Sequence, residues 1–72
     1  MNNANVARIQ LNGDPFELNR GTNLNELLNK LKVQKNKVAV EVNGEIVEKK
    51  KYLNLILNNN DKVEIVQFIG GG

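Results

Sequence analysis

The sequence predicts an α+β fold, with one helix packed across one face of a mixed sheet of four to five strands. Apolar and polar residues alternate in segments near both ends of the chain, and between these segments apolar residues recur at helical spacing. Alternating strands give a sheet an apolar face, which the apolar stripe of a helix can cover. A chain of 72 residues buries a single core, so we expect one domain over residues 1–69 and a flexible tail at residues 70–72.

The first two strands are predicted to form a hairpin. Ala7, Ile9 and Leu11 alternate with polar residues, which is the period of a half-buried strand. Residues 12–15, Asn-Gly-Asp-Pro, have the composition of a turn. Residues 16–19 resume the alternation, and we expect them to form the returning strand, which Arg20-Gly21 ends.

The helix is predicted from a change of period after this hairpin. Four leucines fall at positions i, i+3, i+4 and i+7 and therefore share one face: Leu24, Leu27, Leu28 and Leu31. Asn23 and Glu26 have the spacing of a capping box, with Asn in place of the usual Ser or Thr. We expect the helix to end near Lys32.

A second hairpin follows the helix. Residues 38–42 alternate valine with other residues, and Asn43-Gly44 comes next. This dipeptide favours a two-residue hairpin turn, because both central residues of such a turn need a positive φ. Residues 45–47 then begin the returning strand.

The last part of the chain completes the predicted sheet. Residues 52–57 are compatible with a small strand or with a helical turn, and residues 58–61 have the composition of a loop. Residues 63–69 form the last predicted strand, with Val63 and Ile65 facing the helix. Two hairpins that flank one helix form the arrangement known as the β-grasp.

The opposite parity of this strand suggests a docking surface. Val66 and Phe68 are predicted to point away from the helix, beside the end of the chain. We assign Val66, Phe68 and Ile69 to a partner-docking surface, which Val6 from an adjacent strand would extend. The alternative is that Phe68 folds over an edge of the sheet and covers the core, since single exposed apolar residues are normal.

The side-chain chemistry argues against an enzyme. The chain has no Ser, Cys or His and only one Thr and one Tyr, which excludes nucleophilic triads and imidazole relays. Its two Asp and six Glu residues are scattered and match no metal-binding loop. We therefore expect no metal site and no bound cofactor.

Charge and hydropathy exclude two further classes of partner. The net charge is +2, and the single basic run, Lys49 to Lys51, adjoins one aromatic residue, which is too few for a nucleic-acid surface. No stretch of about 18 apolar residues could span a membrane, and the polar start lacks the apolar region of a secretory signal. We expect a cytoplasmic protein that is monomeric when free, and we interpret the many asparagines as compositional bias.

Three consecutive glycines follow the last predicted strand. Extended at about 3.3 Å per residue, Gly70, Gly71 and Gly72 would project roughly 10 Å beyond the fold. No side chain widens this tail, which can adopt the φ and ψ angles that a narrow channel in another protein requires. The candidate reactive group is the carboxylate of Gly72. The alternative is a tail without function, which is common at chain ends.

Two segments of the sequence are similar to one known family. Val38 to Val47, VAVEVNGEIV, and Asp61 to Gly72, DKVEIVQFIGGG, resemble the sulfur carrier proteins of thiamine biosynthesis, which are ubiquitin-like β-grasp proteins. The resemblance extends over nearly the whole chain in element order and length. It implies that the protein is a carrier and a co-substrate of other enzymes.

The resemblance also implies a reaction sequence and a set of partners. A ubiquitin-activating-type adenylyltransferase would use ATP and Mg²⁺ to adenylate the Gly72 carboxylate. A persulfide, supplied from cysteine through a cysteine desulfurase, would convert the adenylate to a thiocarboxylate. The carrier would then donate the sulfur to thiazole synthase.

The sequence departs from the family pattern at two places. Asn60-Asp61 replaces the usual Gly-Asp before the last strand, and Asn tolerates the left-handed conformation better than other non-glycine residues. Lysines replace arginine after the second hairpin, and Lys cannot reproduce a bidentate Arg contact.

Other functions share the predicted fold. The small subunit of molybdopterin synthase carries sulfur in the same way, but its approach to the tail contains a proline that residues 67–70 lack. A ubiquitin-like protein modifier and a binding module with an idle tail are further alternatives.

Overall fold

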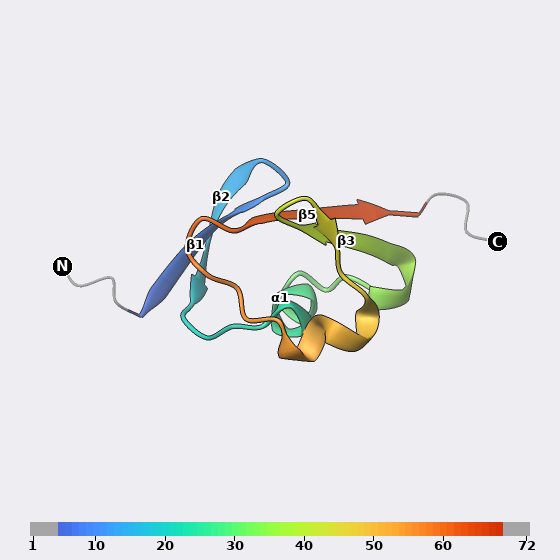
Figure 1. Ribbon diagram of the computed structural model, residues 1–72, viewed down its shortest axis with the longest axis horizontal. Coiled ribbons are helices and arrows are strands. Elements are labelled where there is room, and N and C mark those ends of the chain that lie inside the picture. The colour runs from blue at the N-terminus through green and yellow to red at the C-terminus, as the bar shows by residue number, and fades with distance from the viewer. Residues whose placement is uncertain (1–4, 69–72) are drawn as a thin grey trace.

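The sheet of this protein has five strands in the order β2-β1-β5-β3-β4 (Figure 1). The computed structural model describes residues 5–68, and the structural statements below concern that part of the chain. The elements in chain order are β1 (Val6–Leu11), β2 (Asp14–Asn19), α1 (Leu24–Lys30), the 3₁₀ helix η1 (Lys35–Lys37), β3 (Val38–Val42), β4 (Glu45–Ile46), the 3₁₀ helix η2 (Lys49–Asn54) and β5 (Lys62–Gln67).

The strand pairing is mixed. β1 and β5 are parallel, whereas the pairs β1–β2, β3–β4 and β3–β5 are antiparallel. In Figure 1, α1 and η2 lie on the same side of the sheet, so the other face is open. This arrangement confirms the predicted β-grasp fold, with five strands and one α-helix.

The core lies between the covered face of the sheet and α1. Its largest fully buried side chains come from strands, helix and the loop before β5: Ile9, Leu24, Leu27, Leu28, Val40, Leu57 and Val63. The predicted apolar stripe of the helix is confirmed for three leucines. Leu31, the fourth, is only partly buried because the helix ends at Lys30 and Leu31 is its C-cap. Lys32 follows with a left-handed φ of 59°, and the helix is therefore shorter than predicted.

The helix begins with the predicted capping box. The backbone N–H of Glu26 donates to Asn23 Oδ1 at 2.8 Å, and the N–H of Asn23 donates to Glu26 Oε1 at 2.9 Å. The two bonds satisfy donors that the first turn of a helix leaves unpaired, and a cap of this kind is worth about 1 kcal/mol.

Both hairpins turn on an Asn-Gly dipeptide. Asn43 and Gly44 have φ angles of 54° and 85°, as predicted, and Asn12 and Gly13 have φ angles of 49° and 88°. The first turn is therefore shorter than the predicted 12–15 turn, and Asp14 and Pro15 belong to β2. β2 is an edge strand and tolerates Pro15, which has no N–H to donate. Gln10, which lies opposite Pro15, directs its own N–H to the Asp61 carbonyl oxygen on the other side of β1, so this position of the β1–β2 pair needs no hydrogen bond from Pro15.

Residues 52–57 divide into the two structures that the sequence left open. Tyr52 to Asn54 belong to η2, and Ile56 forms an isolated bridge with Asn23. Tyr52 is 3% exposed, and this burial raises the pKa of its phenol above its usual value. The segment closes the core below the sheet, where Leu57 is buried.

The asparagines are more than compositional bias, because their side chains hold the segments around β5 together. Asn12 Oδ1 accepts from the N–H of Ile65 at 2.7 Å, and Asn43 Oδ1 accepts from the N–H of Lys62 at 2.9 Å. Asn60 has the left-handed φ expected for it, at 73°. These contacts fix the position at which β5 begins.

Candidate functional site

The predicted reactive end lies outside the described residues. Gly70, Gly71 and Gly72, and the docking residue Ile69, follow the last described residue, Phe68. Their roles stay predictions. The structure describes the part of the molecule from which this segment leaves.

The backbone before the tail is held by β3. β5 pairs with β3 in register up to Gln67, which lies opposite Val38, and the N–H of Phe68 donates to the Lys37 carbonyl oxygen at 2.9 Å. The described chain therefore ends, at Phe68, on a backbone that is hydrogen-bonded to the end of the sheet.

Two apolar side chains lie exposed beside this position. Val66 is 59% exposed and Phe68 is 58% exposed, in agreement with the outward parity predicted for them. Phe68 is not among the residues that pack against the core, which argues against the alternative that it covers the core. Their docking role stays a prediction, but their accessibility in the free protein fits it.

Val6 does not extend this patch, and that prediction is wrong. β1 runs parallel to β5, with Gln10 opposite Lys62 and Leu11 opposite Val63. Val6 precedes this paired region, whereas Phe68 follows it. The two residues therefore lie at opposite ends of the sheet. The prediction failed because the alternation within one strand does not show which strand lies beside it, or whether that strand is parallel or antiparallel.

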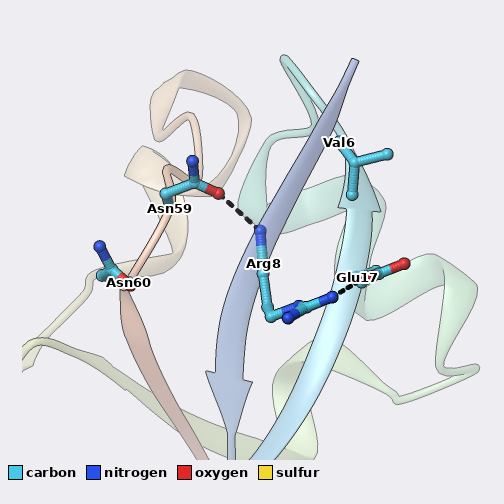
Figure 2. A pocket seen from close by; sticks show the side chains of 5 residues that line it. All are labelled: Val6, Arg8, Glu17, Asn59 and Asn60. Atoms are coloured by element: carbon cyan, nitrogen blue, oxygen red, sulfur yellow. Dashed lines mark hydrogen bonds and ion pairs between the residues drawn. The ribbon is translucent and has the colours of Figure 1, made fainter. Parts of the chain in front are cut away.

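Val6 instead borders a shallow hollow of about 290 Å³ over β1 and β2 (Figure 2). Its other lining residues are already paired with one another. Arg8 Nη2 forms an ion pair with Glu17 Oε2, and the Arg8 N–H donates to Asn59 Oδ1 at 2.7 Å. The Asn60 N–H donates to the Arg8 carbonyl oxygen at 2.8 Å. Both charged side chains among the described residues of this hollow, Arg8 and Glu17, are therefore paired with each other.

A second hollow on the same face of the sheet has a different character. It also measures about 290 Å³ and is lined by Glu41, Gly44, Lys62, Glu64 and Val66. Glu41 of β3 lies directly opposite Glu64 of β5 in the antiparallel register. The sequence analysis did not identify this pair, although alternation alone places both side chains on the open face.

A metal-binding cluster is not found in residues 5–68. No group of three or more His, Cys, Asp or Glu side chains there could hold a metal ion, and apart from the Tyr52 phenol no polar or charged side chain there is buried. No helix in this range is long and apolar enough to cross a membrane. The distinctive features are the held base of the tail and the exposed side chains next to it.

Comparison with known proteins identifies the family. The ThiS family matches residues 9–72. The sulfur carrier protein ThiS of Bacillus subtilis is 37% identical over 65 residues, which cover 89% of this chain and 98% of that protein. The crystal structure of the thiamine biosynthesis protein ThiS from Geobacter metallireducens superposes with a TM-score of 0.79 at 37% identity, over 90% of this chain and 99% of that one.

A third relative is much longer. The thiazole synthase of Paramagnetospirillum magneticum is 43% identical over 65 residues, but these cover 90% of this chain and only 20% of that protein. The family match and the Bacillus and Geobacter relatives cover nearly the same part of the chain, and the Geobacter structure has the same fold. The chain therefore belongs to the ThiS family of small, ubiquitin-like sulfur carrier proteins, which are not enzymes themselves.

Proposed function

We propose that this protein carries sulfur for thiamine biosynthesis as a thiocarboxylate on Gly72. The observation that carries the proposal is the family match, which includes the three terminal glycines. The exposed Val66 and Phe68 beside a held tail base support it, because a partner that encloses the tail would also contact them. The names of the Bacillus and Geobacter relatives support the thiamine role.

The proposed chemistry takes place on the terminal carboxylate. A ubiquitin-activating-type adenylyltransferase binds ATP and Mg²⁺, and a carboxylate oxygen of Gly72 attacks the α-phosphorus with release of pyrophosphate. The terminal sulfur of a persulfide then displaces AMP. A thiol cleaves the resulting acyl disulfide and leaves the thiocarboxylate, so the carrier supplies the acyl group and its partners supply the catalytic residues.

The proposed partners follow the same sequence of steps. A cysteine desulfurase or another persulfide donor supplies the sulfur, and thiazole synthase receives it. A segment similar to this chain forms about a fifth of a protein named thiazole synthase, which supports that last partner. We propose a cytoplasmic location, in which a carrier without Cys meets thiol-based donors.

The test is to lengthen the tail. One alanine added after Gly72 moves the carboxylate by about 3.5 Å, and misplacement of a reacting group by 1 Å can cost on the order of a hundredfold in rate. ATP–pyrophosphate exchange with the adenylating enzyme of the same genome should nearly vanish, while the melting temperature stays unchanged. Gly71→Val should also slow exchange, because it widens the tail and restricts φ.

The matched control is the same alanine added at the N-terminus, which should exchange at the native rate. Native exchange by the C-terminally extended protein would show that the Gly72 carboxylate is not the acceptor. Intact-mass measurement after reaction with the sulfur donor should show one oxygen replaced by sulfur. Transfer of that sulfur to a pterin instead of a thiazole would favour the molybdopterin alternative.

A further inference from the structure

Two carboxylates face each other across β3 and β5 on the open face of the sheet. Glu41 and Glu64 are directly opposite in the antiparallel register, while the adjacent Val40 and Val63 are fully buried beneath them. Side chains directly opposite in a ladder have Cβ atoms about 5 Å apart, and like charges in such a pair destabilise it. The register therefore places two like charges side by side on an otherwise regular sheet.

Neither carboxylate is neutralised within the described chain. The ion pairs formed by residues 5–68 are Arg8 with Glu17 and Lys50 with Glu48, and both leave Glu41 and Glu64 without a cation. Lys62 lines the same hollow but forms no ion pair there. In residues 5–68 the two carboxylates are thus left without an ion-pair partner, although Lys62 lies nearby on the same face.

Apolar side chains border the two carboxylates. Ile46 of β4 lies opposite Glu41 and is 73% exposed, and Val66 follows Glu64 on the same face of β5 and is 59% exposed. Phe68 continues the row toward the tail with 58% exposure. Covering exposed apolar side chains with a partner lowers the free energy, because it removes apolar surface from water. The combination of facing carboxylates and exposed apolar side chains therefore favours a protein partner.

We propose that this part of the sheet binds an arginine of the adenylating partner. We name it the acidic-apolar surface, and it consists of Glu41, Glu64, Ile46 and Val66. A guanidinium group offers five N–H donors in a planar fork and can serve two carboxylates at once, which an ammonium group does less well. Its aliphatic stem covers apolar surface such as Val66. The partner's charge converts the repulsion of the free carrier into attraction in the complex.

The proposal rests on the proposed function for the identity of the partner. The position of the surface supports it, since Val66 is only two residues before Phe68, from which the tail leaves. A partner that takes the tail into a channel covers this part of β5. The acidic-apolar surface then selects a partner that presents arginine beside an apolar area.

The first experiment needs no partner. Glu64→Gln keeps the shape of the side chain and removes one charge, and it should raise the melting temperature by roughly 1 to 5 °C because it relieves the repulsion. The matched control is Glu17→Gln, which changes the net charge equally on the same face but removes an attractive pair, and it should not raise the melting temperature. An unchanged or lower melting temperature for Glu64→Gln would overturn the repulsion on which the inference rests.

The second experiment measures binding to the adenylating enzyme of the same genome by calorimetry. Glu41→Gln and Glu64→Gln should each raise Kd about tenfold, mainly through faster dissociation, and Glu17→Gln should change Kd less than twofold. Glu64→Arg should abolish binding, and an Arg→Glu change in the partner should restore it. Equal affinities for the native protein and both Gln variants would overturn the proposal.

The outcomes separate this inference from the proposed function. If the native carrier binds the enzyme but supports no ATP–pyrophosphate exchange, the proposed function fails and the affinity comparison still decides the role of the acidic-apolar surface. If exchange proceeds and the KM for the carrier is the same in Glu64→Gln, the function stands and the surface is not used. If the native carrier does not bind the enzyme, the inference fails as well.

Discussion

The open face of the sheet carries two cross-strand pairs of charged residues, one with opposite charges and one with like charges. Arg8 and Glu17 lie opposite each other across β1 and β2 and form an ion pair, whereas Glu41 and Glu64, which carry like charges, lie opposite each other across β3 and β5. The backbone N–H of Arg8 also donates to Asn59 Oδ1, whereas the second pair is bordered by exposed apolar residues. In one half of the face the facing charges are paired in the free protein, and the other half is the one to which we propose that a partner binds.

The largest expected effect comes from the apolar residues of the second half. Phe68→Ala should weaken binding to the adenylating enzyme by about 1.5 to 3 kcal/mol, the value of burying an aromatic side chain at a contact. The exposure of Phe68 in the free protein implies a change in stability of less than about 0.5 kcal/mol. Binding is measured by calorimetry and stability by urea unfolding.

Val6→Ala is the control for this comparison, since Val6 is an apolar residue on the same face at the other end of the sheet. It should leave the affinity unchanged. A loss of stability without a loss of affinity in Phe68→Ala would show that Phe68 covers the core, and it would remove the contrast between the two halves.

The next largest effect is expected when the Glu41–Glu64 pair is changed into a pair of opposite charges like Arg8 and Glu17. Glu64→Lys places opposite charges across β3 and β5, and it should raise the free energy of unfolding by about 1 kcal/mol. The measurement is urea unfolding at low salt, with the slope of the transition checked for constancy. A destabilised variant would mean that the native Glu64 makes a favourable contact in the free protein.

A smaller effect is expected for the pair that is already complete. Arg8→Gln, Glu17→Gln and the double variant form a cycle whose coupling energy should be about 0.2 to 1 kcal/mol, because both side chains are largely exposed. The coupling should decrease as salt is added. A coupling energy of zero at low salt would show that the Arg8–Glu17 ion pair does not stabilise the fold, and the contrast between the two halves of the face would be lost.

The smallest effect concerns the core beneath both halves. Because burial raises the pKa of the Tyr52 phenol above 10.0, the folded state favours its neutral form. This contribution is fully present below the pKa of the unfolded chain and is lost as the pH rises through the higher pKa of the folded chain. The melting temperature should therefore fall above about pH 10, and Tyr52→Phe should reduce that fall.

Local patterns were sufficient for the elements and for the direction of their side chains. The helical spacing of the leucines and the spacing of Asn23 and Glu26 predicted the helix and its cap, which the structure confirms. The preference of Asn43-Gly44 for a positive φ predicted the second turn. Alternation predicted that Val66 and Phe68 face water. Each of these inferences depends on interactions within a few residues.

The pairing of distant strands was beyond such patterns. Alternation gives the face on which a residue lies but not the strand beside it or its register. Val6 was therefore placed next to Phe68, although the parallel pairing of β1 and β5 separates them. For the same reason the opposition of Glu41 and Glu64 was missed. Residues 52–57 were ambiguous because a short apolar run satisfies both periods.

The parallel pairing of β1 and β5 has a practical consequence. The described chain begins at Asn5, next to β1, and ends at Phe68, beyond β5, and Figure 1 shows these two positions at opposite ends of the sheet. A fluorophore or an affinity handle attached at Asn5 would therefore lie at the end of the sheet opposite Phe68. The carrier can be immobilised by that side on a sensor chip while enzymes approach it from the other.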